Sequence, residues 1–215
     1  MTELAATQNN AGKIFAKLIT YIFHPLFIPT YIFFWVLLRF HIQFAGITQQ
    51  ALFFRKINVF WMTAFFPAFS VFLLWRLKFV DNIFLRTQKE RIIPYIISMF
   101  FYWWMWYLSR NFEDQPEILR SFYFGIFIAT VPALIINNFI KVSMHAMAIG
   151  SAFACILLTC FFYKTNLGAD ISIAAIITGA VCTARLLLNN HTNKEIYTGL
   201  FIGITSQLLA YNFVL

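Results

Sequence analysis

The chain has 215 residues, of which 61% are hydrophobic and only 11% are charged. A water-soluble domain of this size has too small an interior to bury so much apolar surface, so we expect lipid to surround most of the chain. The formal net charge of +8 does not indicate a nucleic-acid partner, because the basic residues are scattered at the ends of apolar segments. The composition therefore predicts an integral membrane protein.

The first apolar segment runs from about 17 to 38 and follows a polar stretch that lacks the charged-then-apolar layout of a cleaved signal peptide, so we expect it to be retained. Pro25 and Pro29 lie inside it and predict a kink or a division, since proline removes a backbone N–H and clashes with the preceding helical turn. The segment is either one kinked spanning helix or a re-entrant or interfacial piece followed by a shorter span.

The rest of the chain offers further apolar segments of the length that crosses a bilayer, which is about 20 helical residues. They lie at about 57–75, 92–108, 120–138, 143–163, 170–188 and 197–213. The connections are short, and we find no linker or repeat. We predict a single all-α domain over residues 1–215, a bundle of six to seven transmembrane helices. Its broad aromatic surface suits contact with lipid or with a second copy in a homodimer.

Three polar clusters fall at the ends of these segments. They are "RTQKERIIP" (86–94), "KVSMH" (141–145) and "RLLLNNHTNKE" (185–195). Because successive helices leave one membrane face and return to it, all three clusters are expected on the same face. That face also carries more lysines and arginines than the other, but the excess disappears when those in the clusters are left out. The positive-inside rule therefore leaves the orientation open.

The cluster at 185–195 combines a cation, a histidine and a carboxylate. His191 and Glu195 are four residues apart, which places them on one face of a helix. A carboxylate bonded to one imidazole nitrogen fixes the tautomer and leaves the other nitrogen free as a nucleophile or base. Glu195 equally fits a capping box with Thr192 as N-cap, and both roles stay open. Arg185 can bind phosphate oxygens through two parallel hydrogen bonds, or anchor the helix end among lipid headgroups.

The cluster at 141–145 supplies a serine and a second histidine near the start of the fifth segment. Ser143 lies where free backbone N–H groups and the helix dipole favour an anion. His145, facing a phosphoester, can protonate the leaving oxygen as a general acid. Lys141 adds a cation two residues before the serine.

The first cluster contributes three cations, Arg86, Lys89 and Arg91. They can surround a phosphate or bind anionic lipid headgroups. Glu90 is expected to pair with one of them, and Pro94 is expected in the first turn of the third segment.

Together the clusters supply a nucleophile, an acid, an orienting carboxylate and an electrostatic clamp. This set of groups predicts phosphoryl transfer through a phosphohistidine, without a metal or a cofactor. No gathering of Asp, Glu or Cys is suited to a divalent ion. His24 and His41 have no such neighbours in the sequence, and we interpret them as structural.

The chain resembles the type 2 phosphatidic acid phosphatase superfamily over about residues 86–200. Those membrane enzymes carry two motifs that matter here. The former is Pro-Ser-Gly-His, and the latter is Ser-Arg, then His after five residues, then Asp after three more. The stretch "ARLLLNNHTNKE" (184–195) keeps the spacing of the latter motif, with Ala184 for the serine and Glu195 for the aspartate. The stretch "VSMH" (142–145) keeps the serine and histidine of the former.

The family's first motif is Lys, six residues, Arg-Pro, and the match to it is poor. Arg86 and Pro94 can be laid on its two ends, but Ile93 then stands where arginine is expected. Arg91 or Lys89 is the candidate to replace that arginine. This mismatch affects which residues are expected to bind the phosphate. The roles that the resemblance implies for the histidines are unchanged.

The resemblance implies that His191 attacks phosphorus, that Glu195 orients it and that His145 protonates the leaving group. The implied phosphate-binding residues are Arg185, Ser143, Arg86, Lys89 and Arg91, to which we add Lys141 from its position. The expected function is hydrolysis of a phosphate monoester or pyrophosphate of a glycerolipid or polyprenyl lipid, by a multi-pass protein of the cell membrane, most simply the inner membrane of a bacterium. The alternatives are a non-catalytic relative that binds phospholipid headgroups and a small membrane transporter subunit.

Overall fold

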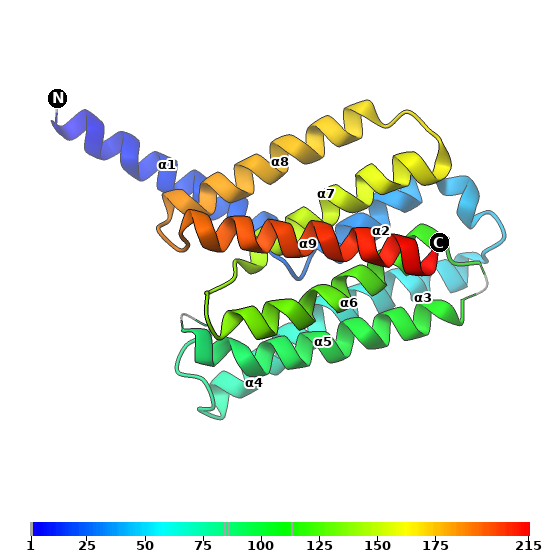
Figure 1. Ribbon diagram of the computed structural model, residues 1–215, viewed down its shortest axis with the longest axis horizontal. Helices are drawn as coiled ribbons and strands as arrows, with labels where there is room; N and C mark the ends of the chain where they lie inside the picture. Colours follow the sequence, from blue (N-terminus) through cyan, green and yellow to red (C-terminus); the bar gives the residue numbers. More distant parts are fainter. Residues whose placement is uncertain (1, 84, 86, 113) are drawn as a thin grey trace.

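The computed structural model describes residues 2–83, 85, 87–112 and 114–215, and within these ranges every regular element is helical. The predicted all-α class is confirmed. Figure 1 shows long helices lying side by side, with α1 projecting beyond one end of the bundle. The α-helices are α1 (Thr2–Ile22), α2 (Ile28–Arg39), α3 (Gln49–Phe60), α4 (Phe66–Arg76), α5 (Gln88–Arg110), α6 (Glu117–Asn137), α7 (Met144–Tyr163), α8 (Gly168–Leu187) and α9 (Asn193–Val214).

Four helices in the described ranges are long and apolar enough to cross a membrane. They are Gln49–Arg76, Glu117–Asn137, Met144–Tyr163 and Gly168–Leu187. The first of these is a continuous helix made of α3, a π-helical turn at Trp61–Phe65 and α4. These helices agree with a membrane protein, while the finer number of six to seven crossings stays a prediction.

The first apolar segment is divided, which was one of the two predicted arrangements. α1 ends at Ile22, and α2 begins at Ile28 with Pro29 in its first turn. Proline at this position is favourable because the first helical N–H groups have no partner inside the helix. α2 has 12 residues, which at 1.5 Å per residue gives about 18 Å, too short to cross a bilayer alone.

The closest helix packing in the bundle joins α9 to α7 through small residues. A Cβ atom on Gly199 would lie 2.6 Å from the carbonyl oxygen of Ser143, and one on Gly203 would overlap the carbonyl group of Met147. Glycines spaced by four residues allow two helix backbones to touch, which is a common way to join helices inside a membrane. α9 also reaches α6, where the buried Gln207 side chain donates a hydrogen bond to the Phe122 carbonyl oxygen.

The same packing brings several helix ends together at one end of the bundle. The first residues of α5, α7 and α9 and the last turn of α8 lie at the end from which α1 projects (Figure 1). Polar side chains from these helix ends form the candidate site described below.

The glycine contact predicts a sharp difference between two Gly→Ala variants. Gly203→Ala should lower the thermal stability of the detergent-solubilised protein, because the added methyl group forces α9 away from α7, at a cost of about 1–3 kcal/mol. Gly179→Ala in α8 is the matched control, since a Cβ there meets no atom within 4 Å. The measurement is the fraction of monodisperse protein left after heating, and equal melting of both variants would contradict the close packing.

Candidate functional site

The N-terminus of α9 carries a histidine–carboxylate pair. His191 Nδ1 and Glu195 Oε2 are 2.7 Å apart. The same carboxylate oxygen accepts the backbone N–H of Thr192, at 3.2 Å, and the Thr192 hydroxyl accepts the N–H of Glu195, at 3.4 Å. Glu195 therefore closes the capping box and holds the imidazole at once, so the two roles that the sequence left open occur together.

The turn before His191 sets its position relative to α8. Asn189 has a φ of 51°, a left-handed conformation that asparagine adopts more readily than most residues. Its N–H donates to the Leu186 carbonyl, and the N–H of Asn190 donates to the Arg185 carbonyl. The chain thus turns back tightly after α8, which keeps the last turn of that helix close to His191.

The pairing with Glu195 fixes the tautomer of His191. Because a carboxylate only accepts, Nδ1 carries the proton and Nε2 keeps its lone pair in the neutral ring. Nε2 has no hydrogen-bond partner in the part of the chain that the structure describes. The side chain is almost entirely buried, so the free nitrogen faces the interior of the site rather than bulk water.

The surroundings of His191 favour its neutral form. Burial lowers its pKa, and the positive charges of Arg185 and Arg91 lower it further, while the hydrogen bond to Glu195 partly opposes both effects. The net direction is downward from the ordinary value of about 6.5. The imidazole is therefore uncharged at neutral pH, as a nucleophile or base must be.

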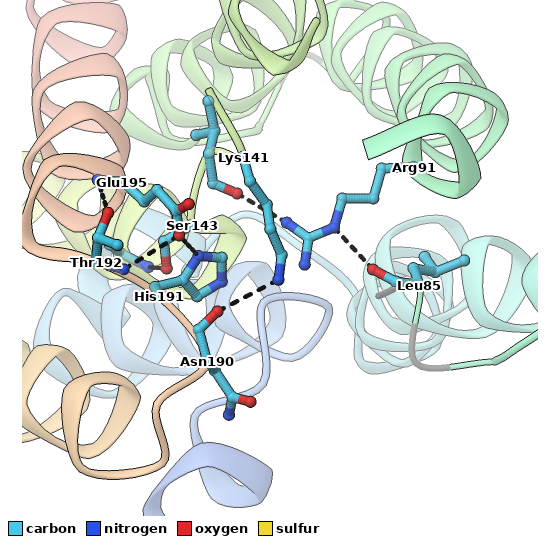
Figure 2. Close-up of polar contacts among 10 residues, drawn as sticks. Leu85, Arg91, Lys141, Ser143, Asn190, His191, Thr192 and Glu195 are labelled. Carbon is cyan, nitrogen blue, oxygen red and sulfur yellow. Dashed lines mark hydrogen bonds and ion pairs between the residues drawn. The ribbon is translucent and has the colours of Figure 1, made fainter. Parts of the chain in front are cut away.

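Ser143 caps α7 and joins it to α9. Its hydroxyl accepts the N–H of Ala146 at 3.4 Å, and its own N–H donates to the carbonyl oxygen of Glu195 at 3.2 Å. Figure 2 shows its side chain close to the imidazole of His191. Ser143 is completely buried, so its placement in the predicted site is accompanied by a structural role.

Two cations, Lys141 and Arg91, come from different elements and lie next to each other (Figure 2). Lys141 Nζ donates to the Asn190 carbonyl at 3.3 Å. The guanidinium of Arg91 donates to the carbonyl oxygens of Leu85 and Val142, at 2.9 and 3.0 Å. Burial and the charge of Arg91 lower the pKa of Lys141, although Glu195 partly compensates. These contacts tie the loop before α7 to both α5 and the α8–α9 turn.

Arg185 and His145 complete the set of site residues that the structure describes. The charge of Arg185 acts on His145, His191 and Lys141. Its buried Nε has no hydrogen-bond partner among the described residues. Nε2 of His145 lies 3.3 Å from the Thr20 carbonyl oxygen, at the end of α1.

The cluster that the sequence places at 86–94 contributes less than predicted. Arg86 lies outside the described residues. Lys89 is exposed on the first turn of α5. Arg91 contacts the cluster at 141–145, through the Val142 carbonyl oxygen.

Glu90 forms a capping box with Thr87, and its other oxygen accepts the N–H of Asn82. Its expected pairing with a cation of this cluster stays a prediction, because Arg86 lies outside the described residues. The expected position of Pro94 in the first turn was wrong. Pro94 lies in the interior of α5 because that helix begins earlier, at Gln88.

His24 has a neighbour among the predicted site residues. It lies in the break between α1 and α2, and its ring centroid is 5.4 Å from that of His145. The sequence did not indicate this neighbour, and the interpretation of His24 as a structural residue stays a prediction. The prolines around it predicted the break, but nothing in the sequence indicated that the break would meet the start of α7.

An open hollow of about 450 Å³ adjoins the site on its outer side. It is lined by the first turns of α5 and α9 and by the loop before α7, with Lys141 and Glu195 among its lining residues.

The chain was compared with family models, curated proteins and solved structures. No family model, no curated protein and no solved structure matches it.

The environment of His191 predicts its titration. The imidazole should remain neutral, with the proton on Nδ1, at pH 6, because burial and two guanidinium groups oppose a further positive charge. Since the unfolded chain takes up this proton near pH 6.5 and the folded chain only at lower pH, the free energy of unfolding should fall as the pH drops below about 6.5. Histidine side-chain NMR in micelles reports the tautomer and the pKa directly.

Glu195→Gln should lower the pKa of His191 further, because the carboxylate is the group that raises it. His191→Gln identifies the signal by removing it. A His191 that gains its proton at or above pH 6.5 in the intact protein would contradict this electrostatic description.

Proposed function

We propose that the chain is a membrane-embedded lipid phosphatase of the type 2 phosphatidic acid phosphatase kind, acting through a phosphohistidine. The observation that supports this most directly is the 2.7 Å contact between His191 Nδ1 and Glu195 Oε2, which leaves Nε2 free on a ring that the positive charge of Arg185 acts on. A neutral, oriented imidazole in the field of a guanidinium group is suited to attack a phosphate that the cation holds.

In the first step, the Nε2 lone pair of His191 attacks phosphorus. The P–N bond forms as the bond from phosphorus to the lipid oxygen breaks, and positive charge develops on the imidazole. Glu195 stabilises that charge through Nδ1. Arg185 and Lys141 lie where they can offset the negative charge of the phosphate oxygens.

His145 is the proton donor to the leaving oxygen in this proposal. Its Nε2 faces the Thr20 carbonyl, and since a carbonyl only accepts, the neutral ring carries its proton there. The acid form therefore gains its second proton on Nδ1. The negative charge of a bound phosphate favours this protonation.

In the second step, water attacks the phosphohistidine. A P–O bond forms, the P–N bond breaks, and the proton of water passes to His145 Nδ1, which gave up its proton in the first step. Both histidines return to their starting states, and inorganic phosphate leaves through the outer hollow.

The position of the site favours a lipid substrate. Helix ends at one end of an apolar bundle lie near the membrane surface, so a phosphate on a lipid can reach the cations while its tail stays in the bilayer. The substrate class is a monoester or pyrophosphate of a glycerolipid or polyprenyl lipid, and the proposed location is the cell membrane.

A second candidate function is binding of phospholipid headgroups without hydrolysis. It is favoured by the state of Arg91, whose guanidinium donates to two backbone carbonyls, those of Leu85 and Val142. Because these bonds occupy part of its donor set, Arg91 holds the loop before α7 and has fewer donors left for a phosphate. A site with a weakened clamp can still bind an anion through Arg185 and Lys141.

The phosphohistidine mechanism predicts a complete loss of phosphate release in one variant and a partial loss in another. His191→Ala should abolish phosphate release from a panel of phosphatidic acid, phosphatidylglycerol phosphate and undecaprenyl pyrophosphate, because it removes the nucleophile. Glu195→Gln should retain the fold, since an amide oxygen can still close the capping box, but release phosphate about 10- to 100-fold more slowly. Substantial residual release by purified His191→Ala would refute the mechanism. Binding without release by the unmutated protein would favour the headgroup-binding function.

Phosphate release should persist in EDTA. The described residues include no group of three or more His, Cys, Asp or Glu side chains placed to hold a metal ion, and the proposed steps use only side chains. The same lipid panel is assayed before and after chelation. Activity that is lost in EDTA and restored by a divalent ion would point to different chemistry.

A further inference from the structure

The break between α1 and α2 places a third histidine against the proposed site. The His24 ring meets the His145 ring edge to face, with an interplanar angle of 82°. The charge of Arg185 acts on His24 as it does on His145 and His191. The charge of one guanidinium group therefore acts on three histidines from three separate parts of the chain.

The local backbone fixes which nitrogen of His24 is available. The N–H of Leu26 points to His24 Nδ1, at 3.4 Å. Since a backbone N–H only donates, Nδ1 is the acceptor and the proton of the neutral ring is on Nε2. The Nε2–H group has no acceptor among the described residues. Folding thus leaves one donor without a partner among the described residues on a ring that packs against His145.

Two other polar atoms also lack partners. Arg185 Nε and Thr20 Oγ1 are both buried without a hydrogen bond to the described residues. Thr20 is the residue whose carbonyl oxygen lies against His145. Leaving a buried polar atom unpaired costs free energy. A ligand with several acceptor oxygens would supply partners to these donors, and a phosphate group has such oxygens.

We propose that His24 is a phosphate-binding residue of the site, donating its Nε2–H to an oxygen of the substrate phosphate. This inference rests on the proposed function and adds a residue from outside the three sequence clusters. A neutral N–H donor offers a hydrogen bond without adding another positive charge to the site. The divided first segment is then part of the phosphate site.

Three substitutions separate a donor role from a structural one. His24→Gln keeps an N–H close to the position of Nε2. His24→Asn keeps an acceptor for the Leu26 N–H but has no donor at the Nε2 position. His24→Phe keeps the ring packing against His145 and neither polar function. His41→Gln is the matched control, because His41 lies in the separate helical turn His41–Phe44 beyond α2.

We measure the affinity of the full chain for inorganic phosphate in detergent by ³¹P NMR titration. His24→Gln and His41→Gln should bind within a few-fold of the unmutated protein. His24→Asn and His24→Phe should bind about 10- to 100-fold more weakly, the loss expected for one hydrogen bond to a charged group. Phosphate release from short-chain phosphatidic acid is measured in parallel on the same samples.

The outcomes separate the two proposals. Two results would overturn the role of His24 as a phosphate donor. One is equal phosphate binding by all His24 variants, and the other is binding that is lost in His24→Gln and kept in His24→Asn. If lipid hydrolysis continues in that case, the proposed function stands without it. Weaker binding in His24→Asn and His24→Phe, with no hydrolysis by any sample, supports His24 and refutes the phosphatase. An unmutated protein that neither binds nor releases phosphate overturns both.

Discussion

Gly199 and Gly203 let the backbone of α9 touch that of α7, and the arrangement of the polar residues depends on this contact. Because the helices are so close, the N–H of Ser143 reaches the carbonyl oxygen of Glu195. That hydrogen bond joins the first turn of α7 to the first turn of α9. The two capping residues and the two histidines of these turns are thereby held in one place. A wider separation would leave His145 and His191 on unrelated helix ends.

The site concentrates positive charge that the described residues do not balance. Arg91, Arg185 and Lys141 act on one another, and Glu195 is the carboxylate that interacts with Arg91, Lys141 and His191. Partial burial strengthens these repulsions because less water screens them. An anion entering between the cations relieves the repulsion, and a phosphate adds acceptors for the unpaired donors. The electrostatics therefore favour an anionic ligand whether or not hydrolysis follows.

In the proposed mechanism, the same side chains cap helices and take part in the chemistry. Glu195 closes a capping box and holds His191, and Ser143 caps α7 within the site. Sharing of this kind keeps catalytic groups rigid, because the helix end fixes the rotamer that the chemistry needs. It also means that the loss of one side chain affects both stability and function, which is why the proposed variants retain a hydrogen-bonding group wherever the capping role must survive.

The sequence by itself determined the helical class, the approximate helix positions and the pairing of His191 with Glu195. These features depend on local rules, namely long apolar runs, four-residue spacing on a helix and capping patterns. It also predicted a kink or a division of the first segment, since proline acts on its own backbone neighbours, and the structure shows the division.

Tertiary structure decided which clusters meet. Arg91 reaches Val142 through a contact between residues 51 positions apart in the chain, and His145 meets His24 across a still longer separation. Lys89, two residues from Arg91, is exposed instead, because successive residues of a helix point in different directions. No local pattern encodes such meetings. They follow from how closely α9 packs on α7 and from where the break after α1 comes to rest.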